Sequence, residues 1–288
     1  MKISEILNTK ETLLSFEMFP PKEDSDYDAV INAAERLSRL SPDFMSVTFG
    51  AGGGTRKNTI SIASHIQNEC GITALAHLTC FSTKKDDINR IVDKLGDLGV
   101  NNILALRGDP PKEDTGVTPD FIYASQLIEE IKRRGDFCVG GACYPDGHVE
   151  CGNKEKDIDH LKIKVGAGCD FLITQMFFDN NVLYNFLYRL HSKGINVPVF
   201  AGIMPIMSAN QIWRSVALSG TVLPAKHRAI LDRYGDNPKA LRQAGIAYAI
   251  EQIIDLISNG VRGIHIYTLN RPSIGEEIVS AVSELIRG

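Results

Sequence analysis

Short apolar runs alternate with longer segments of helical periodicity along the whole chain. The apolar runs have the length of strands, and Gly, Pro or charged residues bound them. Because they are nearly continuous in hydrophobicity, they are typical of strands that are covered on both faces. The predicted strands are Leu13–Phe19, Phe44–Thr48, Thr73–Thr79, Ile103–Leu106, Phe137–Cys143, Phe171–Thr174, Val197–Ala201 and Gly263–Tyr267.

The intervening segments carry apolar residues at helical spacing, as Val30, Ala33 and Leu37 do. Regular alternation of this kind predicts βαβ units and a parallel sheet. Eight units in 288 residues favour a closed (β/α)8 TIM barrel over an open doubly wound sheet, as one domain spanning residues 1–288. The predicted helices are Ile3–Asn8, Asp26–Leu40, Thr59–Cys70, Lys84–Leu98, Pro119–Arg134, Glu155–Gly166, Asn181–Lys193, Ser208–Leu218, Ala225–Tyr234, Pro238–Asn259 and Ser273–Arg287.

Composition narrows the class of protein. A hydrophobic content of 43% is typical of a globular chain, and a net charge of −4 speaks against a nucleic-acid partner. No apolar run approaches the roughly 18 residues of a membrane span, and Met1–Glu5 lacks the apolar core of a signal peptide. We therefore expect a cytoplasmic protein with no membrane partner.

The 6 cysteines do not form a CxxC pair, and their spacing does not match a zinc or iron–sulfur signature. Cys143, Cys151 and His148 form the one grouping that could concern a metal. Reduced, buried thiols are the ordinary state in a cytosolic chain, so we expect no resident metal.

The residues that follow the predicted strands, most of them polar, would share one mouth of the barrel. Ligands bind at the carboxyl ends of strands in this fold, and stability alone does not require so many polar groups in one place. These residues are Glu17, Thr48, His77, Arg107, Asp109, Tyr144, Gln175, Met204, Tyr267 and Arg271.

Arg107-Gly108-Asp109 directly follows a buried strand and precedes two prolines, which end the strand. A ligand-binding strand end and an ordinary surface turn with an incidental ion pair both fit this stretch.

Glu17 is the sharpest candidate for catalysis. Strand geometry places Phe16 and Met18 on the opposite face, so Glu17 would point into the barrel. A carboxyl group is costly to ionise there, so we expect it to hold a proton near neutrality and act as an acid. The alternative is a Glu paired with a neighbouring Arg or Lys. His77, on an apolar strand, fits a hydrogen-bonded core histidine, and Trp213 is expected in the core.

Several motifs in order along the chain together resemble a known family, the 5,10-methylenetetrahydrofolate reductases, in the form of the bacterial catalytic subunit. Each motif is weak alone, but each lies at a predicted strand end and together they cover nearly the whole chain. The motifs are Ser15–Pro21, Val47–Ala51, Ala76–Cys80, Leu106–Asp109, Tyr144–His148, Ile173–Asp179, Gly202–Pro205 and Tyr267–Arg271.

The resemblance implies a flavin-bearing (β/α)8 barrel with FAD at its mouth. It implies Glu17 as general acid, Asp109 as the carboxylate beside flavin and folate, and Gln175, Gln211 and Arg271 as further substrate contacts. Ile163 and Ser215 depart from the basic and aromatic residues of some members. The residues implied to contact FAD are Thr48, Phe49, Ala51, His77, Arg107, Gly108, Asp109, Tyr123, Ala124, Tyr144, His148, Cys151, Asp157, His160 and Lys164.

The implied reaction reduces methylenetetrahydrofolate to 5-methyltetrahydrofolate in one-carbon metabolism and methionine biosynthesis. The sequence leaves the electron donor open between NADH, NADPH and an iron–sulfur partner subunit, and a homo-oligomer is an expectation from the family. A flavin-free, pterin-binding methyltransferase barrel is the alternative function, although the cysteines do not supply its thiolate–zinc centre. A non-catalytic barrel is the third reading.

Overall fold

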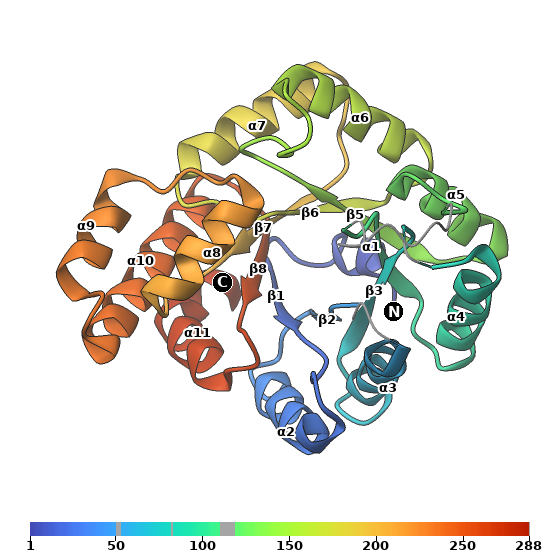
Figure 1. The fold of residues 1–288 in the computed structure, drawn as a ribbon, viewed down its shortest axis with the longest axis horizontal. Coiled ribbons are helices and arrows are strands. Elements are labelled where there is room, and N and C mark those ends of the chain that lie inside the picture. The colour runs from blue at the N-terminus through green and yellow to red at the C-terminus, as the bar shows by residue number, and fades with distance from the viewer. Residues whose placement is uncertain (50–52, 82, 110–118, 288) are drawn as a thin grey trace.

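The computed structural model describes residues 1–49, 53–81, 83–109 and 119–287. Eight parallel strands pair in chain order, and β8 pairs with β1 to close the barrel (Figure 1). This confirms the predicted (β/α)8 fold. The strands are β1 (Leu13–Met18), β2 (Phe44–Val47), β3 (Thr73–Thr79), β4 (Asn102–Leu106), β5 (Cys138–Cys143), β6 (Phe171–Thr174), β7 (Val199–Ile203) and β8 (Gly263–Tyr267).

Helices surround the barrel (Figure 1), and a short helix begins the chain. Two helices, α8 and α9, lie between β7 and the long helix α10. The helices are α1 (Ile3–Ile6), α2 (Tyr27–Ser38), α3 (Gly53–Asn68), α4 (Lys85–Asp97), α5 (Ala124–Arg134), α6 (Lys154–Gly166), α7 (Asn180–Ser192), α8 (Ala209–Ser219), α9 (Ala225–Tyr234), α10 (Pro238–Ser258) and α11 (Pro272–Arg287).

Three elements begin two or more residues away from their predicted starts. The helix α3 begins at Gly53 instead of Thr59, because its first turns carry Gly and polar residues that give no apolar periodicity. The helix α5 begins at Ala124 instead of Pro119, since the extended Tyr123 caps it. The strand β7 begins two residues later than predicted, after Pro198, which has no N–H to donate to the sheet.

Side chains along each strand alternate between the barrel interior and the surrounding helices. Phe16 and Met18 pack with the helices in the main apolar core, as their spacing predicts. Ser15 and Glu17 take the intervening positions and point inward, where Ser15 and Glu17 meet side chains of β8. The predicted orientation of Glu17 is therefore confirmed.

The amino-terminal half of the barrel interior is mainly apolar. The ring of Phe200 lies edge-on to Phe44 and Phe171, with centroids 5.1 and 5.6 Å away. Glycines leave room for these rings, because a Cβ at Gly140 or Gly263 would lie 2.5 Å from Phe171 or Phe200. Helix α1 closes this end with Ile3, which is fully buried.

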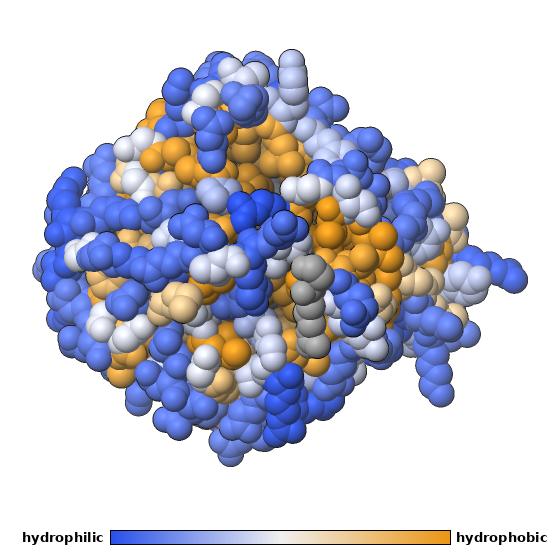
Figure 2. Space-filling view, turned by 180° about the vertical axis from the view of Figure 1, so that it is seen from behind, coloured by the Kyte–Doolittle hydropathy of each residue, from blue (hydrophilic) through white to orange (hydrophobic). Residues whose placement is uncertain are grey.

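A separate apolar cluster lies between α8, α9 and α10 and includes the buried Phe178. The prediction for Trp213 is wrong, because α8 turns this side chain outward and leaves it 46% exposed. Figure 2, seen from behind, shows a mainly hydrophilic surface with separate hydrophobic areas. Within the described part of the chain, no helix has the length and hydrophobicity needed to cross a membrane.

Candidate active site

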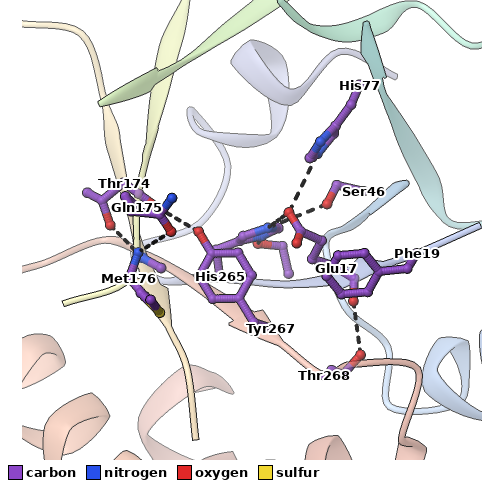
Figure 3. A network of polar contacts seen from close by, with 12 residues as sticks. Glu17, Phe19, Ser46, His77, Thr174, Gln175, Met176, His265, Tyr267 and Thr268 are labelled. Carbon is purple, nitrogen blue, oxygen red and sulfur yellow. Dashed lines mark hydrogen bonds and ion pairs between the residues drawn. The ribbon is translucent and has the colours of Figure 1, made fainter. Parts of the chain in front are cut away.

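The end of β1 places Glu17 in the barrel between two histidines (Figure 3). Its Oε2 atom lies 3.7 Å from Nε2 of His77 on β3 and 3.8 Å from Nε2 of His265 on β8. Glu17 is 8% exposed, and neither Arg nor Lys forms an ion pair with it among the described residues. This arrangement favours the predicted functional role of Glu17 over the alternative of a structural ion pair.

His77 is buried, as a core histidine would be, but its Nε2 atom has no hydrogen-bond partner among the described residues. Burial lowers the pKa of His77 to about 4, against a smaller opposing effect of the Glu17 carboxylate. The imidazole is therefore neutral near pH 7. The reading of His77 as a hydrogen-bonded core residue is wrong at this nitrogen, which is left to interact with Glu17 or a ligand.

His265 is a site residue that sequence reasoning missed. It is fully buried, its Nδ1 atom lies 2.7 Å from Oγ of Ser15, and its Nε2 atom lies 3.4 Å from Oγ of Ser46. The available signal was its position two residues before Tyr267, which puts both on the inner face of β8.

Tyr267 completes the polar group at the end of β8. Its hydroxyl donates a 2.7 Å hydrogen bond to the carbonyl of Thr174, and burial raises its pKa well above the ordinary value. A Cβ at Gly202 would lie 2.5 Å from this carbonyl and 2.6 Å from the hydroxyl, so the contact requires glycine there. Gln175, the predicted substrate-binding amide, follows Thr174 and is half-buried.

The turn after β8 holds the end of β1 in place. Thr268 donates a 2.9 Å hydrogen bond to the carbonyl of Glu17, and Asn270 exchanges two hydrogen bonds with the backbone of Phe19. These hydrogen bonds fix the backbone from Glu17 to Phe19. Arg271, in the same turn, is exposed.

A second group of predicted residues gathers after β4 and β5. The Arg107 guanidinium group makes two hydrogen bonds to Glu150, of 2.5 and 2.7 Å. The rings of Tyr144 and His148 lie 4.6 Å apart. The backbone N–H of His148 donates a 3.1 Å hydrogen bond to the carboxylate of Asp157. Burial, followed by the charge of Arg107, lowers the pKa of His148. Arg107 is therefore paired, but with Glu150 and not with its neighbour Asp109.

Cys151, Asp157 and His160 also come together, with their potential ligand atoms within 4.8 Å of one another. In the structure, Cys151 is thus grouped with Asp157 and His160, whereas the sequence suggested a group with Cys143 and His148. Cys143 is fully buried, and burial raises the pKa of its thiol.

Lys164 lies behind β5, where its ammonium group donates a 2.6 Å hydrogen bond to the carbonyl of Ala142. Burial lowers the pKa of Lys164. This side chain is directed at the sheet, so a phosphate contact would require it to leave the Ala142 carbonyl.

The other predicted site residues occupy varied environments. Gly108 has φ +82°, and a Cβ there would lie 2.9 Å from Thr79, so the backbone needs glycine. Tyr123 is 63% exposed and Asp109 is also exposed, whereas Ala124 is buried. Thr48, Phe49 and Gln211 are half-buried, and Ala51 lies outside the described residues.

A closed parallel barrel with a buried acid, two histidines and a tyrosine at the carboxyl ends of its strands has the architecture of a (β/α)8-barrel enzyme. Within that class, the chain belongs to the methylenetetrahydrofolate reductase family, whose model matches residues 2–283.

Known relatives agree with this assignment. The chain is 34% identical to the 5,10-methylenetetrahydrofolate reductase of Pectobacterium carotovorum, covering 92% of this chain and 88% of the relative. It is 35% identical to the Escherichia coli enzyme over the same shares of both chains. It also matches methylenetetrahydrofolate reductase (NADH) 1 of Arabidopsis thaliana at 34% identity, over 93% of this chain but 48% of that protein.

A solved structure shares the fold at low sequence identity. It is an uncharacterized protein from Clostridium thermocellum that binds two copies of 5-methyl-5,6,7,8-tetrahydrofolic acid. The TM-score is 0.70 at 16% identity, and the match covers 100% of this chain and 98% of the other.

Proposed function

We propose that this chain reduces 5,10-methylenetetrahydrofolate to 5-methyltetrahydrofolate with FAD as its cofactor, and that residues 1–288 act as one flavin-binding catalytic domain. Family membership supports the reaction. The single structural observation that carries the proposal is the buried Glu17 carboxyl group, which faces two histidines and no Arg or Lys of the described chain.

The predicted residues after β4 and β5, together with His77, fit the chemistry of FAD. The glycine backbone at Gly108 permits close approach, and the unpartnered Nε2 atom of His77 can exchange a hydrogen bond with a polar ring. Arg107, His148 and Lys164 provide nitrogen donors near one another for a pyrophosphate, although Arg107 and Lys164 would exchange their present contacts. When bound, the flavin supplies the hydride.

The chain's own contribution begins with a proton. The five-membered ring of the substrate is a poor hydride acceptor until its N10 nitrogen is protonated and the ring opens to an iminium cation. Glu17 is the proposed proton donor to N10, and Asp109 is the proposed carboxylate that favours the cation. Gln175, Gln211 and Arg271 are the proposed contacts that hold the folate.

We propose NADH as the electron donor, since plant relatives carry NADH in their names. NADPH and an iron–sulfur partner subunit are the competing donors, and a homo-oligomer remains a family-based proposal. The folate-binding relative of the same fold supports a pterin ligand at this barrel. We place the reaction in the cytoplasm, where reduced folates and nicotinamide cofactors occur together.

The test is an anaerobic visible spectrum of the purified protein, first with NADH and then with methylenetetrahydrofolate. We expect flavin bands that NADH bleaches and that the folate restores. Flavin that NADH leaves oxidised would reject NADH as donor and direct attention to NADPH or a protein partner. A protein that holds no flavin even after incubation with FAD would overturn the proposal in favour of a methyltransferase barrel.

A further inference from the structure

Cys151, Asp157 and His160 offer three different metal-binding atoms at one place after β5. A thiol sulfur, a carboxylate oxygen and an imidazole nitrogen lie within 4.8 Å of one another. Asp157 and His160 are three positions apart on α6, so both side chains project from the same face of the helix. Cys151 lies in the loop that precedes this helix. The three groups thus come from one continuous stretch of the chain.

Hydrogen bonds fold this loop back onto the first turns of α6. The backbone N–H of Cys151 donates to the carbonyl of His148 at 2.9 Å, and the backbone N–H of His148 donates to one carboxylate oxygen of Asp157 at 3.1 Å. Asn153 caps the helix with its side chain, which accepts from two backbone N–H groups of the first turn. These bonds bring Cys151 next to Asp157, whose second carboxylate oxygen has no hydrogen bond among the described residues.

The charges around the three groups leave Asp157 available for a cation. Asp157 is buried, and neither Arg nor Lys forms an ion pair with it in the part of the chain that the structure describes. Lys164, one helical turn beyond His160, donates instead to the carbonyl of Ala142. Buried carboxylates are usually paired or coordinate a metal. A divalent cation with a thiolate and a carboxylate carries no net charge, so the positive end of α6 does not oppose it.

The donor set selects Zn²⁺ over the hard divalent cations. Mg²⁺ and Ca²⁺ take oxygen ligands, whereas Zn²⁺ binds Cys, His and carboxylate groups. In a tetrahedral zinc site these ligand atoms lie roughly 3.4–3.6 Å apart, with the fourth position left for water. Rotation of the exposed His160 and the half-buried Cys151 side chains closes the present separations. Coordination releases the Cys151 thiol proton to solvent and breaks the 3.3 Å contact of its sulfur with the carbonyl of Asn153.

We propose that Cys151, Asp157 and His160 form an exchangeable Zn²⁺ site, and that Zn²⁺ and FAD exclude each other there. The exclusion rests on the proposed function, in which the same three side chains contact FAD. A bound ion occupies the sulfur, oxygen and nitrogen atoms that the cofactor would contact. The concentration of free Zn²⁺ then sets how much of the protein takes up flavin.

The first test titrates the purified chain, free of metal and flavin, with Co²⁺, which replaces Zn²⁺ and is coloured. We expect the charge-transfer band of a cobalt–thiolate bond and the visible bands of tetrahedral cobalt, both lost when Zn²⁺ is added. Cys151→Ser should abolish the charge-transfer band, and His160→Gln should weaken binding about a hundredfold. The matched controls are Cys70→Ser and His191→Gln, which change a half-buried thiol and an exposed imidazole elsewhere.

The second test measures FAD binding by flavin fluorescence. At a Zn²⁺ concentration about ten times its own Kd, competition should raise the apparent Kd for FAD about tenfold in the wild type. In Cys151→Ser, measured against its own affinity for FAD without metal, the same Zn²⁺ concentration should have no effect.

A titration without the charge-transfer band, or a band that persists in Cys151→Ser, would overturn the metal site. Zn²⁺ binding that leaves the FAD affinity of the wild type unchanged would overturn the exclusion. A protein that takes up no FAD in the absence of metal would instead refute the proposed function. The cobalt titration contains no flavin, so it would still decide whether the metal site exists.

Discussion

At the scale of single residues, the site depends on titratable groups that burial keeps neutral. His77 and Tyr267 face Glu17 from two sides. Burial lowers the pKa of His77 and raises the pKa of Tyr267, so both side chains are uncharged near neutral pH. Among the described residues, no Arg or Lys pairs with the Glu17 carboxyl group between these neighbours. The same physics acts far from the site at His227, which lies between the rings of Phe178 and Tyr248.

Replacing Glu17 by Gln tests the role of the acid. Glutamine keeps the shape but has no proton to give, so we expect folate reduction to fall by about 10²–10⁴-fold, the usual contribution of general acid catalysis. Flavin content and flavin reduction by NADH serve as controls and should remain at wild-type levels in stopped-flow measurements. Normal folate reduction by the variant would remove Glu17 from the mechanism.

Replacing His227 by Phe should make the protein more resistant to acid. Burial lowers the pKa of His227 to about 4, so as pH falls below about 6.5 the unfolded chain takes up a proton before the folded one. The free energy of unfolding therefore falls as the pH is lowered from about 6.5 to about 4. At pH 5 the loss is about 2 kcal/mol, and Phe removes it.

Urea unfolding at pH 7 and pH 5 measures the difference between wild type and His227→Phe. A matched change of the exposed His191 to Gln controls for loss of a histidine as such. Equal losses on acidification in the wild type and His227→Phe would show that His227 is not protonated on unfolding in this range.

At the scale of elements, the helices differ in how closely they approach the barrel. In α10, Gly245 packs directly on the chain after β7, and a Cβ there would lie 1.9 Å from the carbonyl of Ile206. In α6, a Cβ at Gly166 would meet nothing within 4 Å. Two helical glycines that look alike in the sequence therefore have different roles.

The pair Gly245→Ala and Gly166→Ala separates helix propensity from packing. Alanine is favoured over glycine in helices by roughly 1 kcal/mol, so Gly166→Ala should leave stability equal or slightly higher. Gly245→Ala should lower it by about 1–3 kcal/mol, because backbone must move to admit the methyl group. Thermal and urea unfolding measure both, and a stabilised Gly245→Ala would contradict the close contact of α10.

At the scale of the whole molecule, closure of the barrel separates an apolar end from a polar one. Phe44, Phe171 and Phe200 fill the amino-terminal half, and Ser15, Glu17 and the histidines occupy the half toward the mouth. The apolar half stabilises the fold, and the polar half holds the candidate catalytic residues, which is the usual division in this fold.

Replacing Phe200 by Ala should therefore lower stability and leave the site chemistry in place. Removal of a buried Phe costs about 3–5 kcal/mol, and here it also removes both edge-on ring contacts. Urea unfolding measures the cost, and the folded variant should keep the pH profile of folate reduction. A cost below about 1 kcal/mol would mean that the interior repacks around the lost ring.

The sequence by itself determined the barrel, most element positions and the inward direction of Glu17. These features follow from local periodicity: alternation of runs sets the βαβ order, and a strand period of two sends Glu17 and Phe16 to opposite faces. The motifs at the strand ends also pointed to the family that the comparisons show. Exposure of Trp213 was missed, since helical spacing does not say whether one or both faces of α8 are covered.

Only the tertiary structure decided which polar groups meet. His265 reaches Ser15 and Glu17 because β8 closes on β1, a pairing between residues some 250 positions apart in the chain. The pairing of Arg107 with Glu150 and the unpartnered nitrogen of His77 likewise depend on how separate elements approach. Local patterns cannot contain this information, because the distance between two side chains in a barrel depends on register and closure, which all the strands set together.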